Sequence, residues 1–216
     1  MPADESLIEA LADQSRALLG ANVRTRAAAL AGPIPSLPPE EDAVVATAVE
    51  KRRREFAVGR TLARALLAEV GSPVRHLPRR EDRAPEWPSG VAGTITHTDE
   101  VAVVAVTRGE VGLGLDVEEA SPLPEAMARL IVRPDERTVT RDLAKVAFSA
   151  KEAFYKAQYR YTETLLDFLD VSLHMDLSAQ TFEVEVHHPA GRYLPTPRAQ
   201  GSWRRIGPWI LSAVRI

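Results

Sequence analysis

The stretch EVGLGLDVE at residues 110–118 governs how the rest of the chain is interpreted. Apolar residues alternate along it with glycines and acids, which predicts a strand with one buried face. Asp116 and Glu118 are two residues apart, so their side chains leave the same face of that strand. The same face otherwise carries only Gly112 and Gly114, and we expect this bare surface to let a bulky group approach the backbone.

The two acids have two interpretations. Alternating strands commonly present a solvated polar face, and Asp116 and Glu118 taken alone fit that ordinary role. Two carboxylates this close also repel each other unless a cation neutralises them. Oxygen ligands of this kind suit Mg²⁺, which completes its coordination with phosphate and water. A metal site therefore needs support from another part of the chain.

Such support comes from FSAKEAFYKA at residues 148–157, which lies in a helix predicted over about 145–161. Glu152 and Lys156 are four residues apart and share a helical face. A common ion pair on a solvated helix explains this spacing equally well. A third carboxylate with a cation nearby is nevertheless what a site for a metal and a phosphate requires.

The remaining elements predict an α+β protein with antiparallel sheets. Helices are expected at 4–19 and from about 40 to 70. Further strands are expected at 91–97, 101–107, 171–175, 181–188, 202–206 and 209–216. Helices and strands follow one another in this order twice, before and after about residue 110. We therefore expect two similar halves (a pseudo-dimer), 1–109 and 110–216, each a small antiparallel sheet packed with helices.

The composition limits the classes of function. The chain has 216 residues, a formal net charge of −3 and no cysteine. Without cysteine there are no disulfides, thiolate metal sites or cysteine nucleophile, and the acidic balance argues against nucleic acid. No apolar run reaches the length of a membrane span, and the first residues carry acids where a signal peptide carries basic residues. We expect a cytoplasmic protein without a membrane or nucleic-acid partner.

Basic residues and a histidine precede the acidic strand. A helix that includes KRRREF at residues 51–56 places three arginines near one face, which suits phosphate binding but is equally typical of a solvated face. These arginines are Arg53, Arg60 and Arg64. His97 ends the strand VAGTITH, where a histidine is more often structural than functional. Beside Thr94 and Thr96 it could also donate to a phosphate.

Together these segments resemble one family. GLGLDVE followed some thirty residues later by FSAKEAFYKA resembles the paired signature of the larger, pseudo-dimeric 4′-phosphopantetheinyl transferases, which serve surfactin- and enterobactin-type synthetases. RRREFAVGRTLAR (52–64) resembles the arginine-bearing helix of that family, and DRAPEWPSGVAGTITH (82–97) resembles its segment from Trp-Pro to Ser-His. The matched motifs run from about residue 50 to 157 in the order of the family, whereas the first 40 and the last 55 residues carry no matching motif.

The resemblance implies a reaction and a role for each residue. Family members transfer phosphopantetheine from coenzyme A (CoA) to a serine of an apo acyl or peptidyl carrier protein and release 3′,5′-ADP. Mg²⁺, or Mn²⁺ in its place, would be held by Asp116, Glu118 and Glu152, and Glu152 would also accept the serine proton. Lys156 would neutralise the pyrophosphate with help from Lys151. The implied CoA-binding residues of the N-terminal half are Arg52, Arg60, Arg79, Thr94 and His97.

A monomer with its active site between the two halves is the arrangement that the resemblance implies. Three places depart from the family pattern, with Phe148 where many members have Trp, threonines at 94 and 96 where Ser is common, and Arg83 where many have Gly. Another Mg²⁺-dependent phosphotransferase or nuclease, and a non-catalytic module that binds CoA or a carrier, stay open as alternatives. The carrier (fatty-acid, polyketide or peptide) and the CoA-contacting arginine within 52–54 also stay open.

Overall fold

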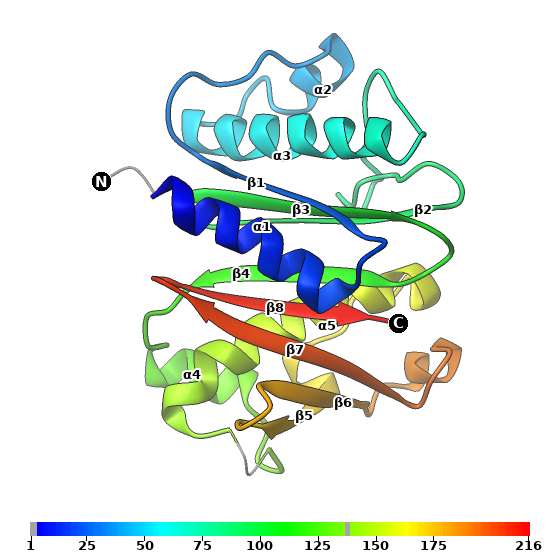
Figure 1. The fold of residues 1–216 in the computed structure, drawn as a ribbon. Coiled ribbons are helices and arrows are strands. Elements are labelled where there is room, and N and C mark those ends of the chain that lie inside the picture. Colours follow the sequence, from blue (N-terminus) through cyan, green and yellow to red (C-terminus); the bar gives the residue numbers. More distant parts are fainter. Residues whose placement is uncertain (1–3, 137–138) are drawn as a thin grey trace. The chain divides into compact units, whose positions relative to one another are not determined.

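The computed structural model describes residues 4–136 and 139–216. The chain forms two compact units, Met1–Glu110 (unit 1) and Val111–Ile216 (unit 2). Each unit has its own antiparallel sheet packed with helices (Figure 1), so the expected α+β class is confirmed. None of the described helices is both long enough and apolar enough to cross a membrane.

Unit 1 is a three-stranded sheet between helices. Its elements are α1 (Glu5–Leu19), β1 (Arg24–Ala29), α2 (Pro39–Val44), α3 (Glu50–Glu69), β2 (Val91–His97) and β3 (Val101–Arg108). The strand order is β1-β3-β2, and both pairs are antiparallel. The central strand β3 is buried over its first seven residues because α3 covers one face of the sheet and α1 covers the other (Figure 1).

Local chemistry explains where these helices begin and end. Asp4 caps α1, since its side chain accepts a hydrogen bond from the Ser6 amide at 2.9 Å. After α3, Gly71 has a φ of +70°, the left-handed conformation expected of a glycine beyond a helix end. The single helix predicted from about 40 to 70 is in fact two, α2 and α3. The separating residues include several β-branched side chains, which have low helix propensity.

Unit 2 is a five-stranded sheet crossed by one long helix. Its elements include β4 (Leu113–Glu119), α4 (Glu125–Ile131), α5 (Ala144–Thr162), β5 (Val171–Asp176), β6 (Thr181–Val186), β7 (Arg198–Ile206) and β8 (Trp209–Arg215). The strand order is β4-β8-β7-β6-β5, with every pair antiparallel. Short 3₁₀ turns at Arg141–Leu143, Phe168–Asp170 and Pro189–Tyr193 complete the unit.

The two units share a topology. In each unit a first strand is followed by a long helix, and the last strand of the unit returns to pair with the first. This gives the pair β1–β3 in unit 1 and the pair β4–β8 in unit 2. The expectation of two similar halves is thereby confirmed at the level of the fold.

Gly112, just before β4, and Gly114, within it, have no side chains to keep another element away from the strand. A Cβ atom added to Gly114 would lie 1.8 Å from the carbonyl oxygen of Ala153, and one added to Gly112 would lie 2.3 Å from that of Ala157. Both carbonyls belong to α5, so the glycines allow the helix to pack directly on the strand. The expected close approach to this surface is confirmed, and the group that approaches is α5. The close packing brings the side chains of α5 next to Asp116.

Candidate functional site

The strand β4 and the helix α5 hold two of the predicted metal ligands in an ion-paired arrangement. Asp116 is buried, and its Oδ1 accepts a hydrogen bond from the Lys156 ammonium at 2.8 Å. Lys156 also donates to the carbonyl oxygen of Leu115 at 2.9 Å. One lysine of α5 therefore neutralises the first carboxylate of β4 and fastens the helix to the strand.

A second lysine does the same for the second carboxylate. The Lys145 ammonium lies 3.0 Å from Oε2 of Glu118, and both side chains are largely buried. The same ammonium lies 5.6 Å from the ring centroid of Phe148, within the range of a cation–π contact. No motif identified Lys145. Its spacing could have done so, because it lies seven residues before Glu152 and hence on the same helical face.

Glu152 differs from the other two carboxylates. Neither an ion pair nor a hydrogen bond joins its carboxylate to the residues that the structure describes. Burial is the main reason that the pKa of Glu152 lies above its ordinary value; the other two carboxylates raise it further, and Lys156 opposes them. Its side chain is therefore left with accepting oxygens and a raised proton affinity.

The three carboxylates repel one another. Burial first, and then Asp116, raises the pKa of Glu118, whereas Lys145 and Lys156 act in the opposite direction. Two ammonium groups thus face three carboxylates. Across residues 4–136 and 139–216, no three His, Asp or Glu side chains are gathered tightly enough to hold a metal ion as they stand. The structure brings the predicted ligands into one neighbourhood without forming a coordination shell.

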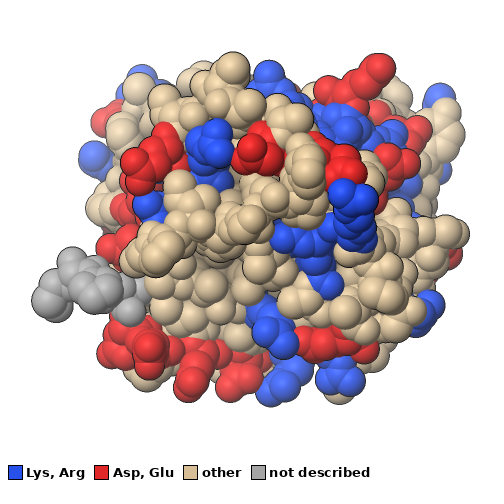
Figure 2. Space-filling view, turned by 90° about the horizontal axis from the view of Figure 1, so that it is seen from above, with Lys and Arg blue, Asp and Glu red and all other residues tan. Residues whose placement is uncertain are grey.

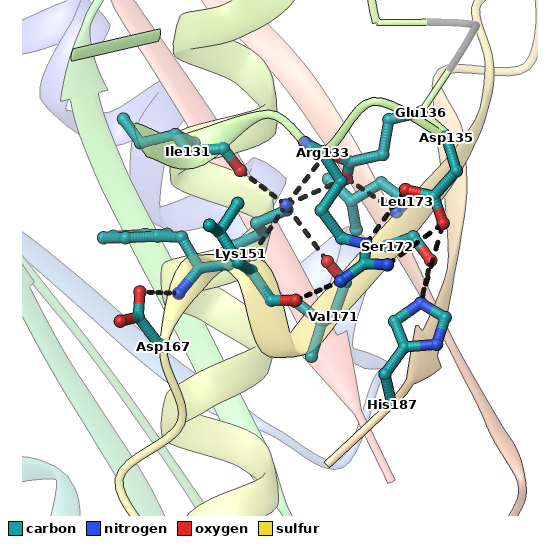
Figure 3. A network of polar contacts seen from close by, with 12 residues as sticks. Ile131, Arg133, Asp135, Glu136, Lys151, Asp167, Val171, Ser172, Leu173 and His187 are labelled. Atoms are coloured by element: carbon teal, nitrogen blue, oxygen red, sulfur yellow. Dashed lines mark hydrogen bonds and ion pairs between the residues drawn. The ribbon is translucent and has the colours of Figure 1, made fainter. Parts of the chain in front are cut away.

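Lys151 does not belong to this neighbourhood. Its side chain is 0% exposed, and its ammonium donates to the carbonyl oxygens of Ile131, Phe168 and Val171 at 2.7, 2.9 and 3.2 Å. It also forms an ion pair with Glu136 at 2.9 Å, whose side chain is equally buried (Figure 3). An ammonium enclosed by four acceptors inside the protein cannot reach a phosphate of CoA. The predicted assistance of Lys151 at the pyrophosphate is corrected accordingly.

The surroundings of this buried pair also contain a serine, a histidine and an aspartate. The Ser172 hydroxyl oxygen lies 2.5 Å from Nε2 of His187, and Oδ2 of Asp135 lies 3.9 Å from the same nitrogen (Figure 3). A catalytic triad uses both ring nitrogens, one for the serine and the other for the carboxylate. Because both oxygens here approach Nε2, the group has no triad geometry.

In unit 1, Arg60 is a buried cation with an unused donor. It is 4% exposed, and its guanidinium stacks 4.9 Å from the ring centroid of Phe56. Its Nη1 has no hydrogen-bond partner in the described part of the chain. Burial lowers the pKa of Arg60 to about 10, with Glu41 raising it and the neighbouring arginines Arg64, Arg79 and Arg52 lowering it further. An anion would satisfy both the donor and this excess of positive charge.

The three arginines at 52–54 have different interaction partners. Nη1 of Arg52 lies 3.3 Å from Nε2 of His97, and both side chains contact the Glu55 carboxylate, at 3.2 and 3.7 Å. Arg53 and Arg54 form ion pairs with other acids, and basic and acidic side chains are mixed over the face that carries α2 and α3 (Figure 2). Arg52 is therefore the arginine of this run that adjoins His97.

The other two predicted CoA-binding residues are placed less favourably. Thr94 is buried, and it lies three residues before His97 on β2, so the two side chains leave opposite faces of the sheet. The expectation that they line the same pocket is corrected for this reason. Arg79 is exposed in the loop before β2, where its backbone forms an isolated bridge with Pro85.

Comparisons with known proteins agree on one family. The family models for the "4'-phosphopantetheinyl transferase N-terminal domain" and the "4'-phosphopantetheinyl transferase superfamily" match residues 40–107 and 112–199. The second match extends beyond the last recognisable motif, into the C-terminal strands.

Two of the similar curated proteins described next carry the same description. The 4'-phosphopantetheinyl transferase Svp of Streptomyces mobaraensis is 39% identical over 168 residues, 73% of this chain and 68% of that protein. PptT of Mycobacterium tuberculosis is 31% identical over 173 residues, covering 76% and 73% of the two chains. Enterobactin synthase component D of Salmonella typhimurium is 35% identical over 119 residues, 51% of this chain and 50% of that one. The chain therefore belongs to the 4′-phosphopantetheinyl transferase family.

Proposed function

We propose that this chain transfers the phosphopantetheine arm of CoA to a serine of an apo carrier protein, using Asp116, Glu118 and Glu152 as its acidic site. The observation that carries the proposal is the meeting of these three carboxylates with Lys156 on β4 and α5. All three lie within residues 112–199, the segment of this chain that matches the superfamily model. Neither a nuclease nor a non-catalytic binding module is favoured by this combination.

The donor set fits Mg²⁺. Burial and the nearby carboxylates raise the pKa of Glu118 and of Glu152, and a divalent cation would stabilise the ionised forms of both. When bound, Mg²⁺ supplies charge stabilisation at the diphosphate oxygens. Binding requires the three side chains to turn toward a common point, since the described residues do not yet form a coordination shell. Mn²⁺ is the natural substitute for such oxygen ligands.

Glu152 is the proposed base. It accepts the proton of the carrier serine while the serine oxygen forms a bond to the phosphorus that bears pantetheine. The bond from this phosphorus to the bridging oxygen breaks, and 3′,5′-ADP leaves. Lys156 stabilises the negative charge of the diphosphate, and its position beside Asp116 keeps it within the acidic site.

Four side chains of unit 1 are proposed to bind the CoA phosphates. Arg60 contributes a buried guanidinium, and its Nη1 has no hydrogen-bond partner among the described residues. Arg52 and His97 contribute a neighbouring pair, and both side chains contact Glu55. Arg79 contributes positive charge near Arg60. The expectation that the active site forms between the two halves stays a prediction.

The test is mass spectrometry of carrier proteins incubated with the purified chain, CoA and Mg²⁺. A peptidyl carrier should be included, because one similar protein is named enterobactin synthase component D, together with acyl carriers. We expect an increase in carrier mass of one phosphopantetheine arm. Unchanged mass for every carrier type would refute the proposed transfer.

Two variants test the role of the base. Glu152→Ala should lower the rate of transfer by about 10²- to 10⁴-fold, the range typical for loss of a general base. Glu119→Ala is the matched control, because Glu119 is an exposed acid at the end of the same strand β4 as the two proposed ligands. Transfer should survive in this control. Equal rates for the two variants would exclude Glu152 as the base.

A further inference from the structure

Lys145 is an unassigned cation within the acidic site. Its ammonium lies 3.0 Å from Oε2 of Glu118, and its side chain is only 14% exposed. Phe148, one turn further along α5, places its ring 5.6 Å from the same ammonium. The aromatic ring and the carboxylate thus hold this cation from two sides, which fixes a side chain that is otherwise long and flexible.

The arrangement pairs each of the two proposed metal ligands on β4 with its own lysine of α5. Asp116 pairs with Lys156 at 2.8 Å, and Glu118 pairs with Lys145. A divalent cation that uses Glu118 as a ligand competes for the oxygen that now accepts the Lys145 hydrogen bond. The ammonium also repels such a cation, and within a partly buried site this repulsion is only weakly screened.

We propose that Lys145 is an internal counter-ion of the metal site, which neutralises Glu118 in the metal-free protein and releases this carboxylate when a divalent cation binds. The inference rests on the proposed function, because it requires a metal at the three carboxylates. Its consequence is that the site is held in a metal-free state by the chain's own charge. Binding of the metal and binding of the Lys145 ammonium to Glu118 are then linked and mutually unfavourable.

The linkage predicts that removal of the ammonium strengthens metal binding. Mn²⁺, detected as the free ion by electron paramagnetic resonance, is a suitable probe and needs neither CoA nor a carrier. Lys145→Met should bind Mn²⁺ roughly tenfold more tightly than the wild type, a typical size for coupling between linked sites. Lys145→Arg preserves the charge and the contact with the ring, so its affinity should stay close to that of the wild type.

A lysine outside the site provides the matched control. Lys51 forms an exposed ion pair with Asp99 in unit 1, at 2.6 Å, with side chains 61% and 67% exposed. Lys51→Met removes the same unit of charge from the chain and should leave the Mn²⁺ affinity unchanged. An equal gain in both variants would show that net charge alone is responsible and would overturn the proposal.

Amine labelling of the wild-type protein tests the release directly. Lys145 should react several-fold faster with an amine-reactive ester in saturating Mg²⁺ than in KCl of equal ionic strength, whereas Lys51 should react at the same rate in both. This measurement decides the matter even if Lys145→Met does not fold. Labelling of Lys145 that is unaffected by Mg²⁺ would overturn the proposal.

Asp116→Ala separates failure of this inference from failure of the proposed function. If Asp116→Ala abolishes Mn²⁺ binding but Lys145→Met binds like the wild type, the metal site stands and the counter-ion role of Lys145 is refuted. If Asp116→Ala binds Mn²⁺ as well as the wild type does, the proposed ligand set is wrong and the inference falls with it.

Discussion

Lys151 of unit 2 and Arg60 of unit 1 are both buried cations, but their hydrogen-bond donors are satisfied to very different degrees. Lys151 of unit 2 is 0% exposed and donates to four acceptors, one of them the buried Glu136. Arg60 of unit 1 is 4% exposed, yet its Nη1 has no partner within the described residues. A buried charge is costly unless it is paired and hydrogen-bonded. The difference indicates that Lys151 serves the fold, whereas Arg60 is kept available for an anion.

The largest effect should follow from replacing Lys151, because all of its hydrogen bonds and its ion pair with Glu136 are lost together. Lys151→Met leaves the Glu136 carboxylate buried without its cation, and loss of one partner of such a pair costs about 3–5 kcal/mol. Urea unfolding measures this loss, with Lys51→Met as a control expected to change stability by less than about 0.5 kcal/mol.

A double variant tests whether the pair is responsible. Glu136→Gln removes the orphaned charge, and its amide oxygen can still accept from the Leu173 amide, which now donates to Glu136 at 2.8 Å. Lys151→Met combined with Glu136→Gln should therefore lose less stability than the sum of the two single variants. Strict additivity would mean that the two side chains do not act as a pair.

The second prediction concerns Arg60, whose Nη1 has no hydrogen-bond partner among the described residues. Arg60→Met should reduce CoA binding at least about tenfold, since a hydrogen bond to a charged group contributes roughly 1.5–3 kcal/mol. It should change the free energy of unfolding by less than about 1 kcal/mol, because the substitution removes no hydrogen bond of Nη1 to a described residue. Isothermal titration with CoA and urea unfolding measure the two quantities separately.

Arg64 is the matched control for Arg60. It lies four residues further along the same helix, but it is paired with the buried carboxylate of Glu41, which also accepts from the Leu77 amide at 2.8 Å. Arg64→Met should therefore lower stability more than it lowers CoA affinity. The comparison between the two buried cations would fail if Arg60→Met behaved like Arg64→Met.

These two cations also show what the sequence could predict. The pattern around Arg60 and the strand before His97 indicated phosphate binding, and the alternation around Asp116 placed two acids on one strand face. Lys151 was misassigned because its role was inferred from its place beside Glu152 in the motif FSAKEAFYKA. Helical geometry carried the opposite signal, since Lys151 lies on the face of Ala147 and Phe154, both buried.

Other features depended on tertiary contacts. The strand β1, RTRAAA, has no apolar β-branched residue and was not predicted; its pairing with β3 supplies the stability that its sequence lacks. Gly112 and Gly114 signalled a close approach, but only the structure shows that α5 is what approaches. Lys145 was missed because its ion-pair partner Glu118 becomes a neighbour only when helix and strand pack.

The smallest effect concerns the carboxylate that has no cation of its own. Burial raises the pKa of Glu152 in the folded, metal-free protein above the ordinary value of 4.5. Between the unfolded and folded pKa values the folded state binds more protons, so stability falls as pH rises through this window. At pH 7 the raised pKa of Glu152 therefore opposes folding. Glu152→Gln should stabilise the metal-free protein by about 0.5–2 kcal/mol, a common gain when a functional group is replaced.

The pH dependence distinguishes this effect from a general gain in packing. The advantage of Glu152→Gln should be present at pH 7 and should shrink as pH falls toward 4.5, where the wild-type carboxylate becomes protonated in the fold. Thermal unfolding of both proteins with chelator across this range measures it. A gain that is constant with pH would mean that charge burial is not its cause, and that Glu152, like Lys151, is already compensated by its surroundings.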